Sequence, residues 1–230
     1  MSVHDLQIGG GLTCFAATVI AWWVARLRLA RDRTHFVSEV LALVSWRWQR
    51  GTPVAGFWGS LVASTLLGGG ALAFCLAAVA DLATRPTLTT LCVAVTGGFM
   101  IAILAFPLRE VPWAKAATTG GVDLLHPFFA ASFYVVASVA GLVVLWHAGP
   151  VGTVLAAAHL ASSAALTVTV FVVAHRELGP AAWRPWYLPA VRVLLDLRPA
   201  GETDTEWVRR LQWPATLLIA LDLGLAPTGW

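Results

Sequence analysis

The chain alternates between long apolar stretches and short polar ones, and this pattern predicts its fold. Six stretches come close to or exceed the roughly 20 residues that an α-helix needs to cross a bilayer. They are residues 10–25, 56–80, 87–108, 127–146, 151–174 and 207–226. The last is the least apolar, because it contains Pro214 and Asp222. We expect an all-α, polytopic membrane helix bundle with six transmembrane helices, formed by residues 1–230 as a single domain.

One further apolar segment, residues 35–48, is too short to cross a bilayer. It is also too apolar for a solvated loop, so we expect an interfacial or re-entrant piece. Re-entrant backbone is tolerated only where protein or a water-filled cavity surrounds it. The segment therefore suggests a cavity nearby.

The composition agrees with a membrane protein. Apolar residues make up 58% of the chain and charged residues only 12%, against about 45–50% and about 25% in ordinary soluble domains. The three cysteines, Cys14, Cys75 and Cys92, lie in apolar runs without CxxC spacing, so the sequence supports neither a disulfide framework nor a zinc knuckle. A soluble globule and a nucleic-acid-binding module are both disfavoured.

The distribution of basic residues predicts an orientation. Twelve of the 15 lysines and arginines fall in the first, third and fifth loops, and Arg209 and Arg210 follow at the adjoining start of the sixth span, so 14 lie on one side and Arg85 alone lies on the other. The positive-inside rule places these three loops in the cytoplasm and both termini outside. No basic residue precedes the first span, so we expect that span to remain uncleaved. Arginine far outnumbers lysine, which is typical of GC-rich bacterial genomes, so we expect a multi-pass protein of the bacterial cytoplasmic membrane.

Two ionisable residues lie at membrane depth, where such groups are functional candidates. Asp222 is about 22 Å into the sixth span and His159 about 12 Å into the fifth, at 1.5 Å per residue. The spans run in opposite directions, so the two residues have comparable depth. Two interpretations stay open: a hydrogen bond that holds two helices together, or a buried proton donor and acceptor.

A second candidate group is His35, Ser38 and Glu39, whose spacing places them on one helical face. A Ser–His pair suggests a nucleophile and its base, and a Glu–His pair suggests a tuned general acid. A solvated helix face is the alternative.

Asp123 and His126 precede the fourth span, with Pro127 placed as the first residue of that helix and His126 as its cap. A polar helix start at the cytoplasmic surface is the alternative to a chemical role. Aromatic residues that could line a substrate cavity are Trp46, Trp48, Phe128, Phe129, Phe133 and Tyr134.

Several motifs resemble a known family. The segment HFVSEVLA (35–42) is similar to a His-Pro-Ile-Ser-Glu-Leu motif. The segments AFPLRE (105–110) and LLHPFFAASFY (124–134) are similar to a Phe-Pro motif that is followed by Leu-His. The segment VRRLQW (208–213) is similar to the sequence at the start of that family's last helix. The motifs that these segments resemble are those of a bacterial six-helix membrane family of unknown function related to the Frag1/DRAM proteins. The resemblance implies six helices and makes His35, Ser38, Glu39 and His126 the first residues to test.

The chain also resembles, more loosely, the small integral-membrane terpene cyclases, in size, aromatic content and buried carboxylates. This likeness implies a metal-independent, proton-initiated cyclisation of a prenylated substrate without a cofactor. Glu39 is then the leading candidate acid and Asp222 the second, and His35 or His126 tunes the acid or accepts the final proton. Ser38, Asp123 and His159 join the aromatic residues as candidate substrate contacts.

Two other functions stay open. A metal-dependent lipid hydrolase would draw its ligands from His35, His126, His159, Asp123 and Asp222, which include the types that zinc binds. A non-catalytic partner or transport protein needs these residues only for packing.

The predicted topology can be tested with reporter fusions. Fusions after Arg50, Lys115 and Arg198 should all report a cytoplasmic position, because the basic loops are retained there. A fusion at Trp230 should report the outside, and a cytoplasmic signal there would contradict a sixth span.

Overall fold

The computed structural model describes residues 2–28, 40, 56–105, 125–147, 149–178 and 203–225. These residues form six long helices and no strand, which confirms the all-α prediction. The helices are α1 (Val3–Arg28), α3 (Phe57–Thr84), α4 (Leu88–Ala105), α6 (Leu125–His147), α7 (Pro150–Leu178) and α9 (Thr203–Leu225).

Five of these helices, α1, α3, α4, α6 and α7, are long and apolar enough to cross a membrane. Among the described helices only α9 is not, because Glu206, Arg209 and Arg210 make its first turns polar and Gln212 and Asp222 follow further along. The chain thus has the helices of a membrane protein.

Small side chains fill the interior of the bundle, and large apolar ones cover its outside. Twelve of the buried apolar residues are alanines, and the large apolar residues that are exposed are valines, leucines and tryptophans. Lipid provides no hydrophobic drive between helices, so small residues favour close packing while large ones face the acyl chains. Exposed tryptophans lie near helix ends, at Trp23, Trp58, Trp146 and Trp207, where aromatic belts meet the membrane interface.

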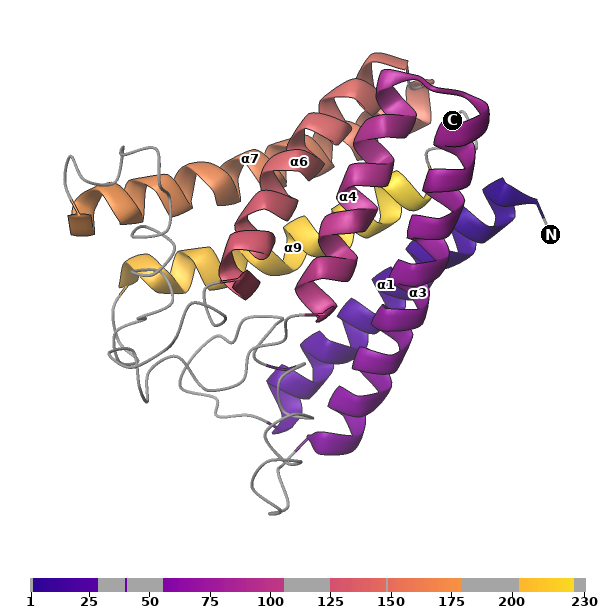
Figure 1. Cartoon of the computed structure of the whole chain (residues 1–230). Coiled ribbons are helices and arrows are strands. Elements are labelled where there is room, and N and C mark those ends of the chain that lie inside the picture. The colour runs from indigo at the N-terminus through magenta and orange to yellow at the C-terminus, as the bar shows by residue number, and fades with distance from the viewer. Residues whose placement is uncertain are drawn as a thin grey trace.

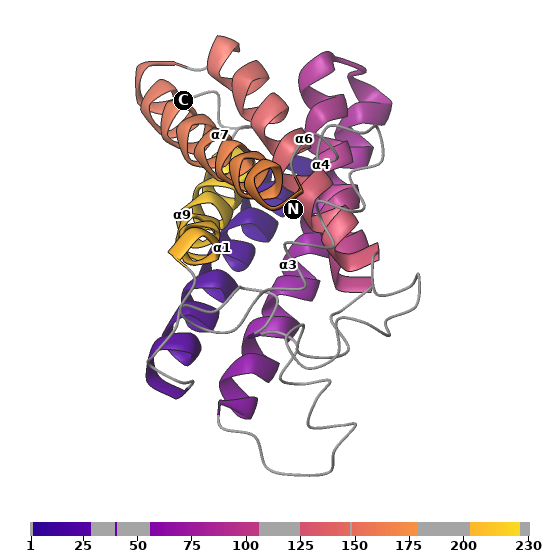
Figure 2. The ribbon, with the colours of Figure 1, turned by 90° about the vertical axis from the view of Figure 1, so that its left-hand side faces the viewer.

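The least apolar helix, α9, is in contact with three others. It passes behind α6 and α4 in Figure 1 and ends beside α1 and α3. Figure 2 shows it between α7 and α1, and it packs against α1, α6 and α7. Ile219 and Leu223 of α9 join the main core cluster with Phe74 of α3 and Phe133 of α6.

Glycines allow α1 to approach two helices at almost the same point. A Cβ atom at Gly10 would lie 2.8 Å from the carbonyl oxygen of Gly70 in α3. A Cβ atom at Gly11 would lie 2.8 Å from the carbonyl oxygen of Ala220 and would also collide with Gly224, both in α9. The backbones of α3, α1 and α9 therefore pack together with no side chain between them at these positions.

Three helices begin a few residues before the predicted spans, and the first is α1, which begins at Val3 and not at residue 10. Helix α6 begins at Leu125, so Pro127 is its third residue and His126 lies within the helix instead of capping it. Proline is tolerated there because the first four N–H groups of a helix have no partner in the helix. Helix α9 begins at Thr203, four residues before the predicted start.

The short apolar segment 35–48 is described at Val40 alone. This residue is fully buried against Ala21 and Val24 of α1 and Ala63 of α3. The hydroxyl of Ser60 donates a hydrogen bond to the Val40 carbonyl. The segment therefore touches the bundle at this residue, and its predicted interfacial or re-entrant form lies outside the described residues.

The close approach of α1 and α9 makes Gly11 sensitive to substitution. Gly11→Ala should destabilise the protein by about 1–3 kcal/mol, because an added methyl group must push two backbones apart. Gly9→Ala is the matched control, since nothing lies within 4 Å of a Cβ atom at Gly9. Denaturation in mild detergent would compare them, and equal stability of the two variants would contradict this packing.

Candidate functional site

The most distinctive polar feature of the bundle is a buried pair formed by Asp222 of α9 and His159 of α7. The Oδ2 atom of Asp222 lies 2.6 Å from Nδ1 of His159, and both residues have 0% exposed surface. The structure thus confirms the contact that their matching depths predict. Ionisable groups this deep in a membrane bundle are rare and are usually paired.

The two residues of the pair lie at different positions along their helices. Asp222 is three residues from the last residue of α9, Leu225, but His159 is nine residues from the start of α7 at Pro150, or about 14 Å along the helix. Gln7 of α1, itself buried, donates from Nε2 to the carbonyl oxygen of Leu223 at 3.0 Å. This bond satisfies one of the last-turn carbonyls that a helix leaves without a partner.

The hydrogen bond between the two side chains offsets part of the cost of burying them. A polar group without a partner is costly among apolar helices. Nδ1 of His159 and Oδ2 of Asp222 provide partners for each other.

A glycine of α6 fixes the plane of the imidazole ring. A Cβ atom at Gly141 would lie 2.9 Å from Cε1, 3.0 Å from Nδ1 and 3.3 Å from Nε2 of His159. The ring therefore lies against the backbone of α6, in a space that only glycine leaves open. This contact keeps Nδ1 directed at Asp222.

Each member of the pair keeps one unused polar atom. Oδ1 of Asp222 and Nε2 of His159 are buried and have no hydrogen-bond partner within the described part of the chain. Leaving a buried polar atom unpaired costs about 1–3 kcal/mol. The pair therefore has one internal hydrogen bond and two further polar atoms that could bond another group.

A second set of polar contacts joins α6 to α9. The hydroxyl of Thr216 donates to the carbonyl oxygen of Gln212 at 2.8 Å, and Tyr134 lies 2.6 Å from the Thr216 oxygen. Either hydroxyl can donate in the contact between Tyr134 and Thr216, which joins the two helices. Sequence analysis placed Tyr134 in a cavity wall and did not foresee this bond.

Two other aromatic residues that were predicted to line a substrate cavity lie in the described part of the chain. Phe133 is buried in the main core cluster. Phe129 packs on Phe99 of α4 with ring centroids 6.2 Å apart. Both rings pack between helices. Their predicted role toward a substrate stays a prediction.

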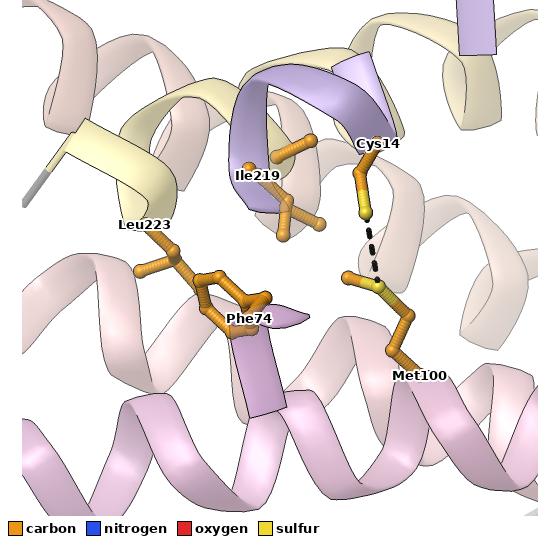
Figure 3. A pocket seen from close by; sticks show the side chains of 7 residues that line it. Cys14, Phe74, Met100, Ile219 and Leu223 are labelled. Atoms are coloured by element: carbon orange, nitrogen blue, oxygen red, sulfur yellow. Dashed lines mark hydrogen bonds between the residues drawn. The ribbon is translucent and has the colours of Figure 1, made fainter. Parts of the chain in front are cut away.

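Figure 3 shows an apolar pocket where α1, α3, α4 and α9 meet. Cys14 and Met100 face each other across it with their sulfur atoms 3.7 Å apart. Its lining contains none of the predicted aromatic wall residues, and it has no room for a water molecule. Since sites for drug-sized ligands usually enclose about 300–1,000 Å³, this pocket is a packing gap and not a site for a prenyl chain.

Most other predicted site residues lie outside the described part of the chain: His35, Ser38, Glu39, Trp46, Trp48 and Asp123. His126 and Phe128 are described only as positions in the first turn of α6. Among the described residues, no three His, Cys, Asp or Glu side chains form a group that could hold a metal ion. Of the five predicted metal ligands, the structure brings together His159 and Asp222.

Sequence analysis also missed Gln7 and Gly141. Gln7 left a signal, because a glutamine ahead of a glycine-rich apolar run needs a partner once it is buried. Gly141 left none, since its role depends on which side chain the neighbouring helix places against it.

No family model matches the chain, and neither a curated protein nor a solved structure is similar to it. The resemblances noted in the sequence therefore stay predictions.

A double-mutant cycle would measure how strongly the pair is coupled. Asp222→Ala and His159→Ala should each cost about 3–5 kcal/mol, because either change leaves a buried polar partner unpaired. The double variant should cost clearly less than the sum. Denaturant titration in detergent measures these free energies of unfolding.

The control is the pair of Asp81 and Arg85, whose charged atoms lie 4.0 Å apart, with the Arg85 side chain exposed and that of Asp81 partly buried. Asp81→Ala should cost no more than about 1 kcal/mol. Strictly additive effects at His159 and Asp222 would show that the two side chains are not coupled.

Proposed function

We propose that the protein is an integral membrane enzyme in which the Asp222–His159 pair gives a proton to a lipid-soluble, prenylated substrate. The best candidate reaction is a metal-independent cyclisation, the type performed by terpene cyclases. One observation carries the proposal: a carboxyl group that is completely buried between apolar helices and is hydrogen-bonded to an imidazole at 2.6 Å.

The proposal includes six membrane spans, with α9 as the sixth, both termini outside and the basic loops in the cytoplasm. The packing of α9 against α1, α6 and α7 supports this arrangement. Its polar groups are compatible with membrane depth because neighbouring helices provide partners for them, Gln7 for Leu223, Tyr134 for Thr216 and His159 for Asp222.

The chemistry needs an acid that is neutral when the substrate arrives. The acid adds a proton to an alkene carbon or an epoxide oxygen, the carbocation closes a ring, and a proton leaves from a neighbouring carbon. The product is an isomer of the substrate. The imidazole of His159 stabilises the carboxylate that remains, and a dry site keeps water from capturing the cation. Glu39 is the alternative acid and lies outside the described residues.

A second candidate function is a non-catalytic membrane protein, either a partner subunit or a transporter. The observation in its favour is that Asp222 and His159 are both fully buried and that the described apolar pocket does not include them. In that case the pair holds α7 and α9 together. Activity and stability of the same variants separate the two functions.

The proposal can be tested with membranes that contain the protein and a linear farnesyl-substituted phenol or its terminal epoxide. A cyclic isomer should form, and in D₂O the alkene substrate should gain one deuterium on carbon, which mass spectrometry detects. Asp222→Asn should lower turnover by about 100-fold or more, the usual contribution of a general acid. Asp81→Asn, a carboxyl change outside the pair, is the control.

Glu39→Gln and EDTA complete the design. EDTA should leave turnover unchanged, whereas a metal-dependent hydrolase would lose activity and regain it with zinc. Full activity in both Asp222→Asn and Glu39→Gln would rule out a proton-initiated cyclase that uses either acid. Loss of folded protein in Asp222→Asn, without any turnover in the parent protein, would favour the non-catalytic function.

A further inference from the structure

Ser163 of α7 is unusual among the hydroxyl groups of its helix. Ser162, Thr167, Thr169 and Thr153 each bond a backbone carbonyl three or four residues earlier in the chain. Ser163 is fully buried, and its Oγ has no hydrogen-bond partner within the described residues. Buried hydroxyls are nearly always satisfied, so this exception needs a reason.

The position of Ser163 points to His159. The two residues are four apart in α7, so they lie on the same helical face in consecutive turns. Leu166, on that face too, packs against Ala215 of α9. Ser163 therefore lies on the face of α7 that meets α9, one turn from the pair.

His159 uses Nδ1 to bond Asp222, and its ring lies against the backbone at Gly141. The other nitrogen, Nε2, is buried and has no partner among the described residues, and the same holds for Ser163 Oγ. The two groups belong to residues one helical turn apart, and a buried water typically makes about three hydrogen bonds to groups of this kind.

We propose that Ser163 is a positioning residue for proton exchange at the Asp222–His159 pair, and that its hydroxyl holds a water molecule at Nε2 of His159. A proton from this water binds Nε2 while the proton on Nδ1 passes to Oδ2 of Asp222. The imidazole stays neutral with its proton on the other nitrogen, Asp222 becomes a carboxylic acid, and the hydroxide left behind regains a proton from solvent. The inference relies on the proposed function only for the use of Asp222 as the acid.

Proton exchange at His159 can be measured in the resting protein without a substrate. The full chain, labelled with ¹⁵N-histidine and reconstituted in lipid nanodiscs, gives ring N–H signals, and His159→Gln identifies the one from His159. Saturation transfer from water then reports its exchange rate. Ser163→Ala should slow this exchange by about tenfold, the factor expected for loss of one hydrogen-bonding group.

Ser162→Ala is the matched control, since its hydroxyl bonds the backbone of its own helix, and its rate should stay within about twofold of the parent. Ser163→Thr keeps a hydroxyl and should restore exchange, a rescue that a packing role alone would not give. Ser163→Gly replaces Ser163→Ala if the latter does not fold. An unchanged rate in Ser163→Ala, or equal slowing in Ser162→Ala, would overturn the inference.

The outcome is separable from that of the proposed function. Slower exchange in Ser163→Ala together with no cyclisation by the parent protein would support the proton site and reject the enzyme. Cyclisation that depends on Asp222, with exchange that does not depend on Ser163, would reject this inference alone.

Discussion

The structure depends on one constraint: α9, the most polar of the described helices, must find hydrogen-bond partners within an apolar bundle. Lipid offers none, and an unpaired polar group in hydrocarbon costs several kcal/mol. Three helices provide them, Gln7 from α1, Tyr134 from α6 and His159 from α7. These bonds determine where α9 lies, because each joins a different face or turn of it to a neighbour. Hydrogen bonds thus help to specify which helices pack together and in which register, which packing of alanine and leucine alone would not do.

Glycine makes these bonds possible by allowing backbones to approach. The contact of Gly11 with Gly224 brings α1 to the end of α9, where Gln7 reaches the Leu223 carbonyl. Gly141 has the same role for the pair, since it leaves the space that the imidazole of His159 occupies. The small residues are therefore as important to the candidate site as the polar ones, although they take no part in its chemistry.

The unpaired atoms of the site are its strongest link to function. A pair that served only to join α7 and α9 would be more stable with all its polar atoms satisfied. Nε2 of His159, Oδ1 of Asp222 and Oγ of Ser163 are instead buried without partners among the described residues. Groups of this kind are suited to exchanging protons with a substrate or with water, and a membrane interior keeps such exchange away from bulk solvent. This is the physical basis shared by the proposed acid role of Asp222 and the proposed water site at Ser163.

The sequence by itself determined the helical architecture, because runs of about 20 apolar residues have few other stable states in lipid. It also indicated that Asp222 and His159 lie at the same depth, since depth follows from position along a span. The sequence did not determine where each helix starts. Proline is tolerated at several positions of a first turn, and α6 begins at Leu125, two residues before Pro127. Only the tertiary structure decided that His159 faces Asp222, that Gly141 accommodates its ring and that Tyr134 bonds Thr216. Those facts depend on the rotation and crossing of each helix, which are determined by contacts between residues far apart in the chain.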